Sequence, residues 1–135
     1  MAKFSPDEYR HESNAVSLLN YHFVFIPKRR KKILVGEIAE RLQQIIHEVC
    51  DENRWRLIAL EIMPDHVHMF VNAKPCDDPS KIIRLVKGRA SHHLREEFPD
   101  LKNKLPTLWT PSYFVSTAGN ICTESVKRYI EQQKA

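Results

Sequence analysis

The chain has 135 residues, a length that fits one compact domain over residues 1–135 and leaves little room for a second module. The composition is 42% hydrophobic and 28% charged, as in a globular protein, and no apolar run approaches the roughly 20 residues of a membrane span. Lys and Arg number 21 against 17 Asp and Glu, so the net charge of +4 permits a polyanionic partner without requiring one.

The N-terminus and the cysteines bear on where the protein works. Residues 1–20 form a polar segment that lacks the apolar centre of a signal peptide. No disulfide framework or thiolate zinc site is predicted, because the cysteines are odd in number, widely spaced and without C-x-x-C pairing: Cys50, Cys76 and Cys122. We therefore expect a soluble, cytoplasmic protein with reduced thiols and no membrane partner.

The first half of the chain predicts a strand followed by a helix. Residues 21–26 (YHFVFI) are aromatic and β-branched and end at Pro27, which cannot donate to a sheet ladder, so they predict a strand. From Glu37 onward the apolar residues recur at the spacing of one helical face: Ile38, Leu42, Ile45, Ile46 and Val49. This spacing predicts the first helix.

A hairpin and a second helix are predicted next. Residues 57–63 and 66–71 are two β-rich runs separated only by Pro64 and Asp65, which indicates a tight antiparallel hairpin. Asp78 followed by Pro79 is typical of a helix N-cap and first turn. Apolar residues then recur every four positions and predict the helix itself: Ile82, Val86, Ala90 and Leu94.

The last third of the chain is less regular. Residues 98–111 contain three prolines and few periodic positions, and we read them as an irregular connection into a short fourth strand at 113–117. Gly119 and Asn120 precede a last helix, expected over residues 120–134. Its apolar or semi-apolar stripe is Cys122, Val126, Tyr129 and Ile130.

The predicted order of elements is βαββαβ over residues 21–118, with a C-terminal helix appended. This order predicts an α+β fold in which an antiparallel four-stranded sheet carries two helices on one face. Ferredoxin-like folds and RNA-recognition modules share it, so the fold alone does not identify the function.

Two histidines on the second strand of the hairpin supply half of a candidate metal site. Alternate side chains of a strand share a face, so His66 and His68 project together while Val67 points toward the core. Paired imidazoles suit Zn, Mn, Fe or Ni, and an added oxygen ligand with open positions favours Mg or Mn. The alternative is two exposed strand histidines without any ligand. Glu61 and Asp65 are near enough in sequence to support the pair as outer-shell residues.

The last helix pairs a phenol with a carboxamide. Tyr129 and Gln133 are four positions apart and lie on one helical face, so a nucleophile and an oxygen ligand can address the same point. The alternative is that Tyr129 is a packing residue of the apolar stripe.

Basic residues gather at two places and suggest contacts with nucleic acid. Five cations follow the first strand directly: Lys28, Arg29, Arg30, Lys31 and Lys32. Three more lie on the second helix: Arg84, Lys87 and Arg89. Such groups neutralise phosphates and make binding depend on salt, although a solvated basic loop is the alternative for the first group.

Taken together, these segments resemble the transposases of the insertion-sequence 200/605 type, which are single-tyrosine members of the His-hydrophobic-His endonuclease superfamily. The resemblance runs along nearly the whole chain, through Tyr21-His22, the basic run, and residues 63–68 (MPDHVH), 109–113 (WTPSY) and 129–133 (YIEQQ). It implies that His66, His68 and Gln133 bind a divalent metal, Mg or Mn, and that Tyr129 is the nucleophile.

The resemblance also implies an activity and partners. The protein is expected to cleave and rejoin single-stranded DNA at hairpin-marked element ends through a 5′-phosphotyrosine intermediate. A homodimer is expected, in which the terminal helix of one subunit can complete the site of the other.

Other readings remain open from the sequence. A domesticated palindrome-processing relative or a replication-initiator nuclease would share the superfamily chemistry. A non-catalytic RNA-recognition module should carry a glycine-aromatic signature on its central strands, and here Gly36, Gly88 and Gly119 all lie outside the predicted strands. A metal-sensing regulator would have no need of a tyrosine and a glutamine four positions apart.

Overall fold

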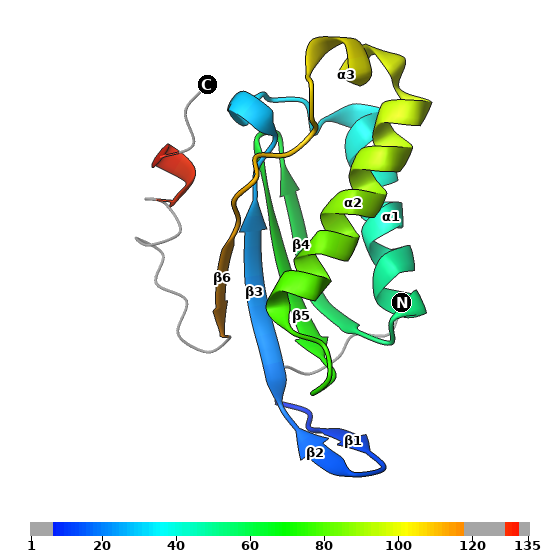
Figure 1. Ribbon diagram of the computed structural model, residues 1–135, viewed down its shortest axis with the longest axis vertical. Coiled ribbons are helices and arrows are strands. Elements are labelled where there is room, and N and C mark those ends of the chain that lie inside the picture. Colours follow the sequence, from blue (N-terminus) through cyan, green and yellow to red (C-terminus); the bar gives the residue numbers. More distant parts are fainter. Residues whose placement is uncertain (1–6, 118–128, 133–135) are drawn as a thin grey trace.

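The computed structural model describes residues 7–117 and 129–132. Its main sheet has four strands in the order β4 (Arg56–Met63), β5 (His66–Ala73), β3 (Leu19–Phe25) and β6 (Phe114–Thr117), and every neighbouring pair is antiparallel. Two long helices, α1 (Gly36–Glu52) and α2 (Pro79–Glu97), cover one face of this sheet (Figure 1). The α+β fold and the four-stranded antiparallel sheet predicted from the sequence are therefore confirmed.

The strands lie close to their predicted positions. They are β3 (Leu19–Phe25), β4 (Arg56–Met63), β5 (His66–Ala73) and β6 (Phe114–Thr117). The turn between β4 and β5 consists of Pro64 and Asp65, as predicted, and Met63 pairs directly with His66. The strand predicted at 21–26 begins two residues earlier, because Leu19 and Asn20 continue the pairing with β5.

The two long helices follow from their apolar stripes. α1 (Gly36–Glu52) buries Leu42, Ile45, Ile46, Val49 and Cys50. α2 (Pro79–Glu97) begins at the predicted N-cap, where the Asp78 carboxylate accepts a hydrogen bond of 2.8 Å from the Lys81 amide. The predicted stripe of α2 is buried in full: Ile82, Val86, Ala90 and Leu94. None of the helices in the described part of the chain is long and apolar enough to cross a membrane.

Three short features differ from the sequence-based prediction: a hairpin, a 3-10 turn and a short helix. Part of the polar segment 1–20 forms a hairpin of β1 (Arg10–Glu12) and β2 (Ala15–Ser17), which projects from one end of the sheet (Figure 1). The basic run begins with a 3-10 turn, η1 (Lys28–Arg30). The connection predicted to be irregular contains α3 (Pro99–Lys104). The sequence does not predict this helix, because a six-residue helix that buries only Leu101 gives no periodic signal.

The hydrophobic core lies between the sheet and the long helices. Alternate strand residues point into it and are fully buried, among them Phe23, Phe25, Val67, Met69 and Val71. The other face of the sheet, here called the open face, is not covered by α1 or α2 (Figure 1). Of the predicted last helix, the structure describes one helical turn at residues 129–132, here called the tyrosine turn, and it lies on the open-face side (Figure 1).

Candidate active site

The two strand histidines lie together on the open face, as predicted. They occupy alternate positions of β5, and Val67 between them is fully buried on the opposite face. The ring centroids of His66 and His68 are 5.0 Å apart, and the rings meet edge to face. Two imidazoles are thus held at one point of the sheet.

Each of these rings is oriented through its Nδ1 atom. Asp65 Oδ1 lies 2.8 Å from His66 Nδ1, so the carboxylate accepts the Nδ1–H proton of that ring. His22 Nε2 lies 3.1 Å from His68 Nδ1, and these two rings stack with centroids 5.3 Å apart. Both Nε2 atoms remain for an ion, and binding through His68 Nε2 selects the tautomer in which His68 Nδ1–H donates to His22.

His22 is a site residue to which the sequence assigned no role. It is only 6% exposed, and its own Nδ1 has no hydrogen-bond partner within the described residues. The signal appears only in the strand pairing: β3 lies antiparallel to β5, with His22 opposite Phe70 and Val24 opposite His68. Because sequence alone does not fix that register, His22 could not be assigned to the histidine pair.

The electrostatics keep the buried imidazoles neutral. Burial lowers the pKa of His22, and the neighbouring His68 lowers it further. Burial also lowers the pKa of His68, with an added contribution from His66, while the Glu61 carboxylate acts in the opposite direction. A neutral imidazole is the form that binds a metal ion.

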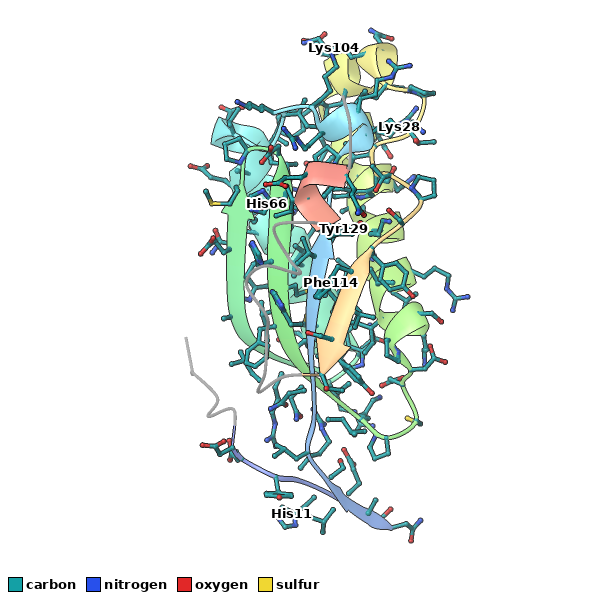
Figure 2. The ribbon with its side chains drawn as sticks, turned by 90° about the vertical axis from the view of Figure 1, so that its left-hand side faces the viewer. His11, Lys28, His66, Lys104, Phe114 and Tyr129 are labelled. Atoms are coloured by element: carbon teal, nitrogen blue, oxygen red, sulfur yellow. The ribbon has the colours of Figure 1, made fainter. Side chains whose placement is uncertain are left out.

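The tyrosine turn places Tyr129 against the same face of the sheet. The phenol oxygen lies 3.1 Å from Ser112 Oγ, and the Tyr129 ring centroid lies 6.0 Å from that of Phe114. Phe114 in turn lies 6.4 Å from the His22 ring, measured between centroids, so aromatic contacts connect the tyrosine with the histidines. Figure 2 looks onto this face and labels His66, Phe114 and Tyr129 on it.

The resting state of the phenol follows from its surroundings. Burial raises the pKa of Tyr129, while hydrogen bonds from the side chains of Ser112 and Thr110 act in the opposite direction. The net direction is upward, so the phenol keeps its proton near neutral pH. Loss of this proton is favoured by a positive charge or a proton acceptor placed close to the phenol oxygen.

The described residues include two of the three predicted metal ligands, His66 and His68. Across residues 7–117 and 129–132, no three His, Cys, Asp or Glu side chains are placed to hold an ion. Gln133, the predicted third ligand, lies outside the described residues, as do Cys122 and Val126 of the predicted stripe.

The candidate outer-shell carboxylates differ in their positions. Asp65 is partly buried, contacts His66 directly, and lies 3.5 Å from Arg30 Nε. Glu61 is exposed and stands opposite His68 in the register of β4 and β5. Of these two carboxylates, Asp65 alone forms a hydrogen bond with a histidine of the pair within the described residues.

The predicted DNA-binding cations divide into two groups. Arg29, Lys31, Lys32 and Arg84 have exposed side chains, and Lys28 is partly buried. The other three have partners within the chain: Arg30 contacts Asp65 and the Ile130 carbonyl, Arg89 pairs with Glu52 at 2.6 Å, and Lys87 donates to the carbonyls of Thr110 and Ser112. Phosphate binding stays a prediction for all eight.

Comparison with known proteins identifies relatives along almost the entire chain. The family model described as "Transposase IS200 like" matches residues 15–133. The ISDra2 transposase TnpA of Deinococcus radiodurans is 33% identical over 130 residues, which cover 95% of this chain and 93% of the relative. The transposase for insertion sequence element IS200 of Salmonella typhimurium is 33% identical over 115 residues, which cover 84% of this chain and 75% of the relative.

Two solved structures share the fold. A crystal structure described as a putative transposase from Deinococcus radiodurans superimposes with a TM-score of 0.86 at 33% identity and covers 93% of this chain and 98% of the other. A REP-associated tyrosine transposase bound to a REP hairpin superimposes with a TM-score of 0.58 at 20% identity and covers 93% of this chain and 68% of that one. At 20% identity the second likeness supports the fold alone.

Proposed function

Because the chain belongs to the family of IS200-like transposases, we propose that it cleaves and rejoins single-stranded DNA at hairpin-marked element ends, with Tyr129 as the nucleophile. Membership makes the protein a DNA transposase and favours an enzyme over a non-catalytic RNA-recognition module. The relatives that are 33% identical are transposases of insertion sequences, which favours transposition over the processing of dispersed palindromes.

One observation carries this proposal: Tyr129 and the histidine pair share the open face. The phenol hydrogen-bonds to Ser112, and the ring contacts of Tyr129, Phe114, His22 and His68 follow one another across the sheet. A packing tyrosine on the covered face would have no such neighbours. The shared face supports a nucleophile that meets its phosphate beside the imidazoles.

The proposed cleavage step exchanges one phosphodiester for another. The Tyr129 oxygen bonds to phosphorus, the bond from phosphorus to the 3′ oxygen breaks, and the 5′ phosphate stays on the tyrosine. The proton lost by the phenol balances the proton gained by the 3′ hydroxyl. In the second step a different 3′ hydroxyl attacks the phosphotyrosine and releases Tyr129, so no nucleotide cofactor is required.

A divalent ion, Mg or Mn, is proposed as the cofactor, with His66, His68 and Gln133 as its protein ligands. When bound, it would polarise the phosphate and stabilise developing negative charge. Support comes from the orientation of the two imidazoles, whose Nδ1 atoms contact Asp65 and His22 and leave both Nε2 atoms for the ion. Glu61 is proposed as a more distant electrostatic neighbour of His68.

The proposed DNA partner is a single strand that carries a hairpin. The relative bound to a REP hairpin suggests this class of ligand. The exposed cations Arg29, Lys31, Lys32 and Arg84 are the candidates for backbone contacts, and each phosphate neutralised should steepen the dependence of binding on salt.

A homodimer is proposed because reciprocal strand exchange by single-tyrosine subunits needs two phosphotyrosines at once. Mixing Tyr129→Phe with His66→Ala subunits tests which subunit supplies the tyrosine. Recovery of cleavage in the mixture indicates that the partner's tyrosine completes the site. Absence of recovery indicates a site assembled within one subunit, and a monomer by light scattering at all concentrations contradicts the dimer.

The experiment that tests the nucleophile incubates the protein with Mg or Mn and a labelled single-stranded hairpin DNA. The native chain should form a covalent adduct that survives denaturation, and Tyr129→Phe should form none. Tyr113→Phe is the matched control, because Tyr113 is a partly buried tyrosine that packs against Phe23, with centroids 6.3 Å apart.

The outcome is read from the pair of variants. An adduct that persists in Tyr129→Phe and disappears in Tyr113→Phe would move the nucleophile to Tyr113. Equal cleavage of a fully paired duplex of the same sequence would count against the single-strand specificity.

A further inference from the structure

Arg30 contacts two segments that both carry candidate catalytic groups. Its Nη1 donates a hydrogen bond of 3.3 Å to the Ile130 carbonyl, in the tyrosine turn directly after Tyr129. Its Nε lies 3.5 Å from Asp65 Oδ2, and the other oxygen of that carboxylate lies 2.8 Å from His66 Nδ1. A polar chain therefore runs from the tyrosine turn through Arg30 and Asp65 to a proposed metal ligand.

The backbone that carries Arg30 is strained and held in place. Arg29 and Arg30 have φ angles of 60° and 50°. Residues other than glycine rarely adopt this left-handed region, because it brings Cβ close to the following carbonyl oxygen. Such strain persists where the surroundings fix the conformation and often marks a functional position.

Two backbone hydrogen bonds, one at the start of the strained turn and one on the segment that follows it, connect this part of the chain to its neighbours. The Lys28 amide donates to the Leu108 carbonyl at 2.8 Å, on the segment that precedes β6. The Leu34 amide donates to the Pro64 carbonyl at 3.0 Å, on the turn that carries Asp65. The guanidinium is thereby directed to the space between the hairpin turn and the tyrosine turn.

The chemistry of the guanidinium suits a bridging role. The side chain of Arg30 is 37% exposed, against 19% for Asp65 and 16% for His66, so the ion pair itself contributes little stability. Its planar array of donors lets one nitrogen bind the carboxylate while another binds the carbonyl at a fixed angle. A lysine supplies the same charge without this fixed geometry.

We propose that Arg30 is a positioning residue that couples the docking of the tyrosine turn to the orientation of His66 through Asp65. In the docked state Arg30 contacts both the tyrosine turn and the Asp65 carboxylate, and Asp65 orients the His66 ring. Tyr129 and His66 are therefore positioned together. This inference rests on the proposed function, in which Tyr129 attacks beside His66. It separates Arg30 from the phosphate-binding role expected of the other cations in the basic run.

Arg29 is a matched control within the same turn. It shares the charge and the left-handed backbone of Arg30, its side chain is exposed, and it has no side-chain hydrogen bond or ion pair within the described residues. Arg29→Lys and Arg30→Lys both keep the positive charge. A phosphate contact tolerates that change far better than a bridge of fixed angles.

The test compares these two variants in two measurements. At saturating hairpin DNA and Mn, Arg30→Lys should form the tyrosine adduct at least about tenfold more slowly, as expected for an outer-shell residue, with unchanged hairpin affinity. In the DNA-free and metal-free protein, amide hydrogen exchange over residues 129–132 should accelerate in Arg30→Lys. Arg29→Lys should leave both quantities at native values.

The results that overturn the inference differ from those that overturn the proposed function. An Arg30→Lys protein with native adduct rate and native exchange refutes the coupling, and weaker hairpin binding with a native saturated rate reassigns Arg30 to phosphate. If the native protein itself forms no adduct, the proposed function fails, and the exchange measurement still decides whether Arg30 docks the turn.

A double variant tests whether Arg30 acts through Asp65. Asp65→Asn should also slow adduct formation, and adding Arg30→Lys to it should slow the reaction by less than the product of the separate effects, because both act on one chain of contacts. Independent, multiplicative losses would contradict a route through Asp65.

Discussion

The two faces of the four-stranded sheet are built from the same strands and serve different ends. On the face covered by α1 and α2, Phe23, Val67 and Met69 are fully buried among apolar neighbours. On the open face, His22 stacks on His68 and hydrogen-bonds to it, and the His22 ring meets Phe114 edge to face. Residues that build the core thus alternate with residues of the candidate site along these strands.

This alternation explains why the site depends on the core. A shift of one residue in strand register would exchange the two faces, placing His68 in the core and Met69 on the open face. The covered face fixes the register because its apolar side chains must be buried. The core therefore positions the histidines without contacting a substrate.

The largest expected effect is the loss of cleavage when His68 on the open face is replaced, and its neighbour Met69 on the covered face provides the comparison. His68→Ala removes a proposed metal ligand, and a loss of about 4 kcal/mol of transition-state stabilisation lowers single-turnover cleavage by about 10³-fold. Hairpin binding without metal should remain near the native value, as measured by a mobility shift. Equal loss of binding and cleavage would instead indicate that His68 supports the fold.

Met69→Ala is the matching change on the covered face. The side chain is fully buried, so its truncation should lower the free energy of unfolding by about 3 kcal/mol. Urea unfolding measures this loss, while cleavage at low temperature should stay close to native. A Met69→Ala protein that is stable but unable to cleave would break the division between the two faces.

His22 should give an intermediate effect, because it acts on the site through another residue. His22→Phe keeps an aromatic ring against His68 and removes the hydrogen bond to His68 Nδ1. The affinity for Mn should fall by about 10- to 100-fold, as for other outer-shell partners of ligating histidines. Isothermal titration measures this affinity directly.

The control for His22 makes the same substitution elsewhere. His92→Phe changes an exposed histidine of α2 whose nearest charged partner is Glu96, and it should leave Mn affinity unchanged. Native affinity in His22→Phe would mean that Asp65 and the backbone suffice to orient the ligands.

The covered face was predictable from the sequence and much of the open face was not. Helical spacing at residues 38–49 and the Asp78 cap depend on neighbours along the chain, and both are confirmed. The pairing of His66 with His68 also needs only strand alternation. His22 and Arg30 acquire their roles through contacts 46 and 100 residues apart, which no local pattern encodes.

Whether a site residue could be predicted therefore depends on how far along the sequence its partner lies. Asp65 adjoins His66 in sequence and was a predicted outer-shell residue, and its carboxylate contacts that ring. Lys87 was grouped with the phosphate-binding cations because its place on a basic helix face is local. Its contacts with Thr110 and Ser112 depend on how residues 105–113 pass the helix, and this segment has two prolines and no periodic pattern from which its path could be predicted.

Lys87 links the two faces and should give the smallest effect. From α2 its Nζ donates to the Thr110 carbonyl at 2.7 Å and the Ser112 carbonyl at 3.1 Å, and Ser112 contacts the Tyr129 hydroxyl. Burial lowers the pKa of Lys87 from 10.5 to about 8. Between these values the unfolded chain binds more protons than the folded one, so stability should rise with pH.

Lys87→Met isolates this contribution, because methionine is similar in length and does not titrate. From pH 8 to 10 the native protein should gain about 1 kcal/mol over the variant in urea unfolding, an amount reduced for partial solvent screening. Burial raises the pKa of Cys50 to about 12 and acts in the opposite sense above pH 9, but both proteins carry that thiol and its effect cancels. A flat difference between pH 8 and 10 would mean that Lys87 keeps its charge, and that the carbonyls of Thr110 and Ser112 stabilise the ammonium enough to offset its burial.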